Sequence, residues 1–238
     1  MATPKEQFDE RVREIDLYFD FLKKVVVDGA SLSVPSDSQT PQPVDLELQK
    51  MLKANAIVLL YNLIESSVRN GLVYIYDNVT GEGRTYRMLR NEMQLIWLDH
   101  WIRHDPGKDI DSSSRKIQEL IQKVVEDKVA EFDAGKLPIQ GNLDAKKIRE
   151  LSKRYGFSHI TTKRTQGGAL LLKVKEGRND LAHGLKSFTE CGRDLTFSSL
   201  HAMKSQVVLY MRQILRNMET FVHKKEYMSV ERHSVASL

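Results

Sequence analysis

The stretch that decides the fold is Ser198–Tyr227, SSLHAMKSQVVLYMRQILRNMETFVHKKEY. Its large apolar residues recur at spacings of 3, 4, 4, 3, 4 and 3 positions, at Leu200, Met203, Val207, Met211, Ile214, Met218 and Phe221. Residues three or four positions apart lie on one face of an α-helix. The spacing therefore predicts a long helix with a single apolar face.

The rest of the chain carries the same helical period, broken at turn-forming residues. Working outward, we predict helices over about 5–28, 46–76, 84–103, 112–132, 144–157 and 169–184. Asp45 and Asp144 are candidate N-caps, and Gly167–Gly168 marks a break. No stretch alternates as a strand would. The prediction is an all-α bundle of about six to eight helices with no significant sheet.

We expect one domain over residues 1–238 rather than two. Its parts are an N-terminal helix at 5–28, an exposed loop rich in proline and serine at 29–45, a core over about 46–227 and a flexible tail at 228–238. The chain of 238 residues, 41% hydrophobic and 29% charged, is typical of a soluble globular protein with a core of its own.

Composition also excludes several classes of protein. The longest apolar runs, such as Ala56–Tyr61, are too short to span a bilayer, so we expect no membrane association. The N-terminus is charged throughout, unlike a signal peptide. A single cysteine, Cys191, excludes an internal disulfide framework and fits the cytoplasm. The net charge of +4 permits a nucleic-acid partner without requiring one.

A metal site is not expected. His100 and His104 are four positions apart and share a helix face, as zinc-binding pairs do. No glutamate stands beside the first histidine, however, and no third ligand is suitably spaced. With Trp97 and Trp101 nearby, the alternative is the end of an amphipathic helix with polar histidines. We predict neither a metal nor a cofactor.

The candidate catalytic motif is Arg178, Asn179 and His183, within KEGRNDLAHG at Lys175–Gly184. The spacing of arginine and histidine is not specific, because Arg154–His159 and Arg216–His223 have similar spacings. Only in the first motif do an asparagine and a histidine stand four positions apart, as neighbours on a helix face. Glycines on both sides would let another chain approach closely, at Gly177 and Gly184.

Arg178 and His183 are five positions apart, about 140° around a straight helix. Three arrangements could bring them to one substrate. The long arginine bends back, the helix begins or kinks at the motif, or the two residues act across two subunits. The residue pattern leaves all three open.

These residue types suit phosphodiester cleavage. Histidine titrates near neutral pH and can take or give a proton. Arginine offers a planar fork of donors to a phosphate, and asparagine can orient the histidine or bind the scissile phosphate. Since the 2′-hydroxyl of RNA can itself attack, no metal is needed. The motif favours a metal-independent endoribonuclease.

GRNDLAHGLKSFTECGRDLT, Gly177–Thr196, resembles the signature of the HEPN superfamily. LLYNLIESSVRNGLVYIYD, Leu59–Asp77, and LDAKKIRELSKRYGF, Leu143–Phe157, are similar to its MAE-type HEPN-like nuclease subfamily. The resemblance implies a HEPN-like helical bundle and RNA cleavage in a cleft between two subunits of a homodimer. It implies Arg178, Asn179 and His183 as catalytic residues, and a bacterial toxin–antitoxin or anti-phage defence role with a possible antitoxin protein as partner.

Two features qualify this resemblance. Some HEPN toxins carry a tyrosine, modified by a partner enzyme, two positions after the histidine, where this chain has Leu185. Many HEPN domains are inactive modules that dimerise or bind nucleic acid or a partner protein. That is the alternative function for this chain.

Further polar residues could line the same cleft. Asn62, Glu65, Ser66 and Arg69 form one polar face of an otherwise apolar helix, and a solvated face is the alternative. Asp180, inside the motif, is a further cleft candidate. Basic residues that could follow an RNA backbone are Lys146, Lys147, Lys153, Arg154, Lys163, Arg164, Lys173 and Lys175.

Overall fold

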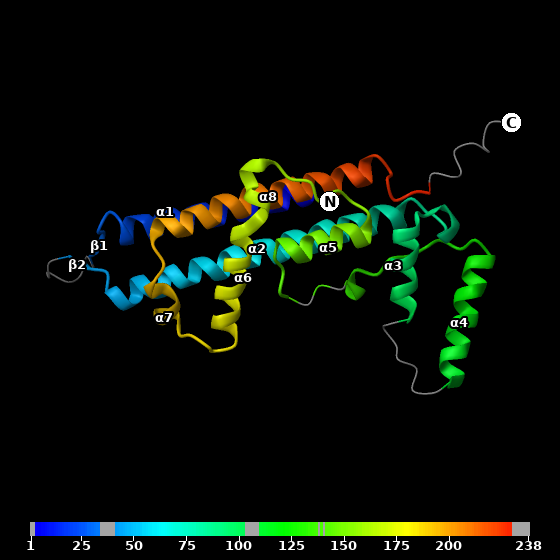
Figure 1. Cartoon of the computed structure of the whole chain (residues 1–238), viewed down its shortest axis with the longest axis horizontal. Helices are drawn as coiled ribbons and strands as arrows, with labels where there is room; N and C mark the ends of the chain where they lie inside the picture. The colour runs from blue at the N-terminus through cyan, green and yellow to red at the C-terminus, as the bar shows by residue number, and fades with distance from the viewer. Residues whose placement is uncertain (1–2, 34–40, 103–109, 138, 140, 230–238) are drawn as a thin grey trace. The chain divides into compact units, whose positions relative to one another are not determined.

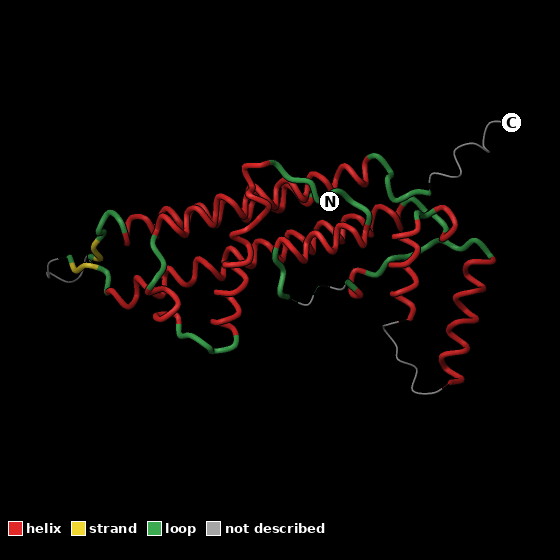
Figure 2. Tube along the Cα trace, in the orientation of Figure 1, coloured by secondary structure: helices red, strands yellow, loops and turns green. Residues whose placement is uncertain are grey.

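The computed structural model describes residues 3–33, 41–102, 110–137, 139 and 141–229. The described part contains eight α-helices, which confirms the predicted all-α class (Figures 1 and 2). They are α1 Pro4–Val26, α2 Leu46–Gly81, α3 Asn91–Ile102, α4 Ile110–Val125, α5 Ala145–Tyr155, α6 Ala169–Ala182, α7 Phe188–Arg193 and α8 Phe197–His223. Two-residue strands, β1 at Ser31–Leu32 and β2 at Gln42–Pro43, pair antiparallel.

The chain forms two compact units. Unit 1 comprises Met1–Ser67, Gly141–Lys147 and Thr161–Gln213, and unit 2 comprises Val68–Gln140, Ile148–Ile160 and Ile214–Leu238. The boundaries fall inside α2, α5 and α8, so these helices contribute residues to both units. The expectation of one domain over the whole chain stays a prediction.

Unit 1 is built on the apolar faces of α1, α2 and α8. The buried side chains of α1 recur every three or four residues, at Phe8, Val12, Ile15, Phe19, Leu22 and Val25. A capping box holds the start of this helix, because Thr3 Oγ1 accepts from the Glu6 N–H and the Glu6 carboxylate accepts from the Thr3 N–H. Arg212 on α8 pairs with Asp9 on α1 at 2.8 Å.

The start of α2 confirms a predicted cap. The Asp45 carboxylate accepts hydrogen bonds from the backbone N–H groups of Glu47 and Leu48, at 2.8 and 3.1 Å. These are donors that the first turn of a helix leaves without partners inside the helix. The helix then continues to Gly81, five residues beyond the predicted end.

Unit 2 buries a cluster of rings from four segments. The Tyr76 hydroxyl lies 2.7 Å from the Tyr155 hydroxyl and 3.0 Å from His100 Nε2. The ring of Phe132 packs against the rings of Tyr76 and His100. Burial raises the pKa of Tyr155 to about 12. His100 lies in the last turn of α3, as expected for a histidine at a helix end, but it is only 5% exposed and belongs to the buried cluster.

The other histidine of that pair, His104, lies outside the described residues. Among the described residues, no group of three or more His, Cys, Asp and Glu side chains could hold a metal ion.

Several helix ends differ from prediction for local reasons. The third helix begins at Asn91 rather than near 84, because residues 86–88 form a separate 3-10 turn. The fourth ends at Val125, shortly before Asp127 adopts a left-handed conformation with φ of 51°. The sequence did not predict α7, whose capping box joins Ser187 and Glu190.

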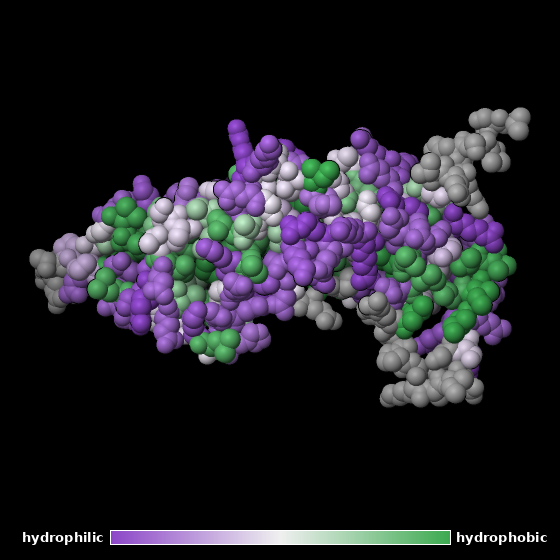
Figure 3. All heavy atoms as spheres, in the orientation of Figure 1, coloured by the Kyte–Doolittle hydropathy of each residue, from purple (hydrophilic) through white to green (hydrophobic). Residues whose placement is uncertain are grey.

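No helix in the described part of the chain is long and apolar enough to cross a membrane. Some large apolar side chains of unit 2 are nevertheless exposed, and they gather over α3 and α4 in the surface view (Figure 3). They are Leu95, Ile102, Ile117, Ile121 and Val125.

Candidate active site

The predicted motif lies in unit 1, at the C-terminal end of α6. The predicted break precedes this helix, since Gly167 and Gly168 both adopt positive φ, 62° and 77°. The helix ends at Ala182, and His183 is its C-cap, with its N–H donating to the Asn179 carbonyl. Arg178 and Asn179 therefore belong to the last helical turns, whereas His183 stands just beyond them.

The Arg178 guanidinium is held by groups of its own chain. Its central carbon lies 3.9 Å from the centre of the Tyr61 ring on α2, a cation–π stack. Its Nη1 donates to Asn179 Oδ1 at 3.0 Å, and its Nη2 lies 3.5 Å from a Glu65 carboxylate oxygen. The last distance is at the outer limit of a hydrogen bond, so Tyr61 and Asn179 provide the closer contacts.

The side chain of Asn179 points toward the segment before α5. Its Nδ2 donates to Asn142 Oδ1 at 2.6 Å while its own oxygen accepts from Arg178. Gly141 and Asn142 both have positive φ, 72° and 56°, so this segment makes a sharp left-handed turn. The turn brings the Asn142 amide to the end of α6.

The His183 side chain is exposed and has no hydrogen-bond partner among the described residues. The predicted four-residue relation of Asn179 and His183 exists in the backbone, where a hydrogen bond joins them. The Asn179 amide itself bonds to Arg178 and Asn142 instead. The imidazole is therefore open to solvent.

A family model described as MAE_28990-like HEPN matches residues 2–227. The chain belongs to this HEPN family. Its membership suggests a nuclease or a nucleotide-binding module, and HEPN domains often dimerise and bind RNA. No curated protein and no solved structure matches the chain. The arrangement of the motif residues therefore carries the functional argument.

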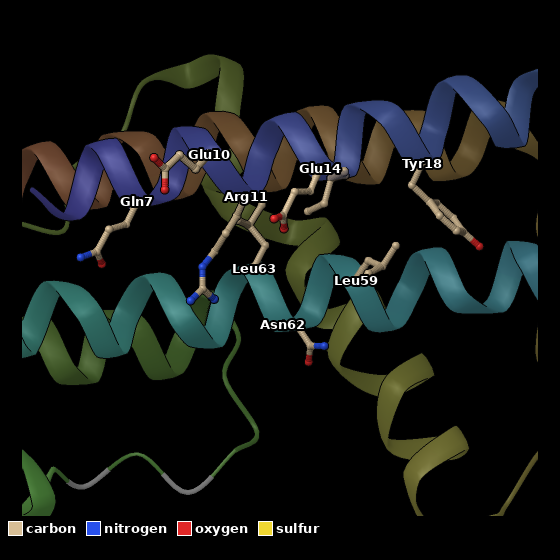
Figure 4. A pocket seen from close by; sticks show the side chains of 9 residues that line it. Gln7, Glu10, Arg11, Glu14, Tyr18, Leu59, Asn62 and Leu63 are labelled. Atoms are coloured by element: carbon tan, nitrogen blue, oxygen red, sulfur yellow. The ribbon is translucent and has the colours of Figure 1, made fainter. Parts of the chain in front are cut away.

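In this HEPN chain, Glu65 on the predicted polar face of α2 contacts the motif within unit 1. Glu65 approaches Arg178, as described above. Asn62 lines a different feature, a hollow of about 540 Å³ beside α1, together with Arg11 and Glu14 (Figure 4). Arg69 belongs to unit 2.

Asp180 takes part in closing the helix end. Its carboxylate pairs with Lys186 at 2.7 Å, and its carbonyl accepts from the N–H groups of Leu185 and Lys186. These bonds satisfy a carbonyl of the last turn of α6. The residue thus ties down the chain beyond His183, and its carboxylate already has a cationic partner.

Two of the predicted basic residues form ion pairs within their own units. Lys175 pairs with Asp144 at 2.6 Å, with the two side chains only 20% and 12% exposed, and Arg154 pairs with Asp99 in unit 2. The other predicted basic residues are exposed: Lys146, Lys147, Lys163, Arg164 and Lys173 in unit 1, and Lys153 in unit 2.

Sequence reasoning did not find Tyr61, Gly141 and Asn142. Tyr61 ends an apolar run of α2 and is fully buried, so its pattern is that of a core residue. Asn142 follows a glycine in a loop, which indicates a turn and nothing more. Neither residue carries a signal that links it to Arg178 or Asn179, which are far away along the chain.

Proposed function

We propose that this HEPN chain is a metal-independent endoribonuclease that cleaves RNA through attack by the 2′-hydroxyl. The observation that carries the proposal is the end of α6, where a fixed guanidinium and a fixed amide stand close in sequence to an exposed imidazole. This residue set can supply the proton transfer and the hydrogen-bond donors that phosphodiester cleavage without a metal uses.

In the proposed reaction, the RNA supplies its own nucleophile. A base removes the proton of the 2′-hydroxyl, whose oxygen bonds to the adjacent phosphorus. The bond from phosphorus to the 5′-oxygen then breaks, and that oxygen takes a proton. His183 serves as the base or the acid, and Arg178 offers N–H donors to the phosphate oxygens as charge develops. The products are a 2′,3′-cyclic phosphate and a 5′-hydroxyl.

The proposed active unit is a homodimer with a composite site. Arg178 is held against Tyr61 and Asn179 of its own chain, whereas His183 has no such partner in the described residues. In a straight helix, a five-residue spacing would separate the two side chains by about 140° around the axis. In the dimer, Arg178 of one protomer would act with the partner's His183.

The proposed biological setting is bacterial toxin–antitoxin conflict or anti-phage defence, with a cognate antitoxin protein as a further partner. A nuclease of this kind acts on cytoplasmic RNA, and the single cysteine of the chain fits that reducing compartment. Expression of the wild type is expected to arrest growth, and expression of Arg178→Ala is not.

The decisive assay is RNA cleavage in EDTA. The wild type is expected to cleave, and His183→Ala to lose nearly all cleavage, on the order of a 100-fold reduction or more. His223→Ala is the matched control, because it removes another exposed histidine at the end of a helix. Equal activity of the wild type and His183→Ala would reject the assignment.

A silent HEPN module that dimerises and binds nucleic acid is the second candidate. Exposed Lys163, Arg164 and Lys173 in unit 1 favour an RNA-binding role that does not depend on cleavage. This candidate predicts RNA binding that weakens steeply with salt, because phosphate contacts release counterions. It also predicts no cleavage under any condition, so metal-free cleavage that requires His183 would exclude it.

A further inference from the structure

Tyr61 links three segments of unit 1 at the motif. Its ring carries the Arg178 guanidinium at 3.9 Å, and its hydroxyl accepts from the backbone N–H of Leu143 at 3.2 Å. The residue is fully buried on α2, so its orientation is set by the core. A guanidinium stacked on such a ring has its plane fixed, while the N–H donors at its edge stay available to a ligand.

The left-handed turn at Gly141–Asn142 closes the other side of this arrangement. A Cβ at Gly141 would lie 3.3 Å from Arg178 Nη2 and 3.8 Å from the Tyr61 hydroxyl, so glycine leaves room for the guanidinium. Asn142 then adopts φ of 56°, which asparagine tolerates better than most residues. Its side-chain oxygen accepts from Asn179 Nδ2.

The result is a continuous chain of contacts. Tyr61 carries Arg178, Arg178 donates to the Asn179 oxygen, and the Asn179 nitrogen donates to Asn142. The bond to Asn142 fixes which end of the Asn179 amide faces the guanidinium. Arginine has five N–H donors, and the bonds to Asn179 and Glu65 leave others for phosphate oxygens.

We infer that Tyr61 and Asn142 are positioning residues for cleavage. Tyr61 sets the plane and location of the Arg178 guanidinium, and Asn142 sets the orientation of the Asn179 amide. The inference rests on the proposed ribonuclease function, because it concerns how that site is held before RNA binds. Preorganised donors contribute most when their placement costs nothing during the reaction.

The first test compares kcat and KM of three variants in EDTA. Tyr61→Phe keeps the ring and is expected to retain most activity, whereas Tyr61→Leu removes the stack and is expected to lower kcat on the order of 10-fold to 100-fold. Asn142→Gly removes the amide but keeps the left-handed turn, and is expected to lower kcat about 10-fold. Asp127→Gly makes the same backbone exchange at a left-handed residue of unit 2 and is the control.

A second measurement separates positioning from a general loss of structure. The Arg178→Lys variant has no planar guanidinium for Tyr61 to hold. Adding Tyr61→Leu to this variant is therefore expected to lower kcat by less than about 3-fold further. If Tyr61 merely stabilised the fold, Tyr61→Leu would lower kcat by the same factor in the wild type and in the Arg178→Lys variant. That result would overturn the inference. Asn142→Gly, which relieves a strained turn, keeps the inference testable if Tyr61→Leu does not fold.

The two possible failures are distinguishable. If the wild type does not cleave RNA in EDTA, the proposed function fails, and the inference fails with it. If the wild type cleaves, His183→Ala does not, and both Tyr61→Leu and Asn142→Gly keep wild-type kcat, only the inference is overturned.

Discussion

At the scale of single residues, Gly192 sets how closely two helices of unit 1 approach. A Cβ at this position would lie only 1.9 Å from the Lys50 carbonyl oxygen on α2, which is backbone and cannot swing aside. Gly192 is buried and belongs to α7, the short helix that follows the motif. The absence of a side chain at Gly192 therefore lets α7 pack closely against α2.

We predict that Gly192→Ala lowers the free energy of unfolding by about 1–3 kcal/mol, because the added methyl group forces the backbones apart. Chemical denaturation measures the change. Gly81→Ala, where nothing lies within 4 Å of the added Cβ, is the matched control and is expected to leave stability unchanged or slightly raised. Equal stability of the wild type and Gly192→Ala would contradict the packing described here.

At the scale of elements, Asp144 joins the start of α5 to α6. Its carboxylate accepts from the Lys147 N–H at 2.8 Å as an N-cap and pairs with Lys175 of α6 at 2.6 Å. Burial by itself raises the pKa of Asp144, but the hydrogen bonds from Lys175 and from Lys147 outweigh it and hold that pKa below its ordinary value of 3.8. The folded state thus favours the ionised carboxylate.

The sign of the pH dependence follows from this depressed pKa. The stabilisation by Asp144 is fully present above the unfolded-state pKa near 3.8 and is lost as the pH falls through the lower folded-state pKa. We predict that Asp144→Ala costs about 1–3 kcal/mol at pH 7. The difference from the wild type should shrink below about pH 4.

Denaturation of both proteins at a series of pH values checks this prediction. Lys175→Met, which keeps an apolar stem but removes the ammonium, is the control and should weaken the same pH dependence. A difference between wild type and Asp144→Ala that stays constant from pH 7 to pH 3 would show that the carboxylate is not held in its ionised form.

At the scale of the whole molecule, the proposed composite site predicts complementation between two inactive variants. In a mixed dimer of Arg178→Ala and His183→Ala, one of the two composite sites receives both an intact arginine and an intact histidine. With random assortment of subunits, about a quarter of wild-type activity should return. If both residues act within one chain, no mixed dimer has a complete site and no activity returns.

Cleavage in EDTA after refolding an equimolar mixture measures this recovery. Each variant refolded alone is the control for residual activity. Sedimentation of the same samples establishes whether dimers have formed, so that absent recovery from a dimeric mixture counts against the composite site.

Much of the fold could be predicted from the sequence because its signals are local. Apolar spacing in Ser198–Tyr227 reports one face of one helix, and Asp45 and Asp144 cap the helices that they precede. Ends set by turn geometry were harder to predict. The 3-10 turn at 86–88 and the left-handed Asp127 shortened two helices, and the capping box at Ser187 was not recognised as the start of another.

The candidate site could be predicted only as a set of residue types. Arg178, Asn179 and His183 are adjacent enough in the chain for their spacing to be informative. The sequence could not predict that Lys175 pairs with Asp144 or that Arg154 pairs with Asp99, because each pair joins segments that are distant in sequence. Two residues expected to meet RNA thus have partners within their own units.

The sequence by itself determined that this chain is helical, where most of its helices begin, and that it carries an arginine, an asparagine and a histidine with HEPN-like spacing. These features depend on backbone hydrogen bonding and on residues within a few positions of one another. Only the tertiary structure decided that Tyr61 lies under Arg178 and that Asn142 receives Asn179. Those contacts join residues from distant parts of the chain, so they exist only once packing has placed α2, α6 and the turn before α5 together.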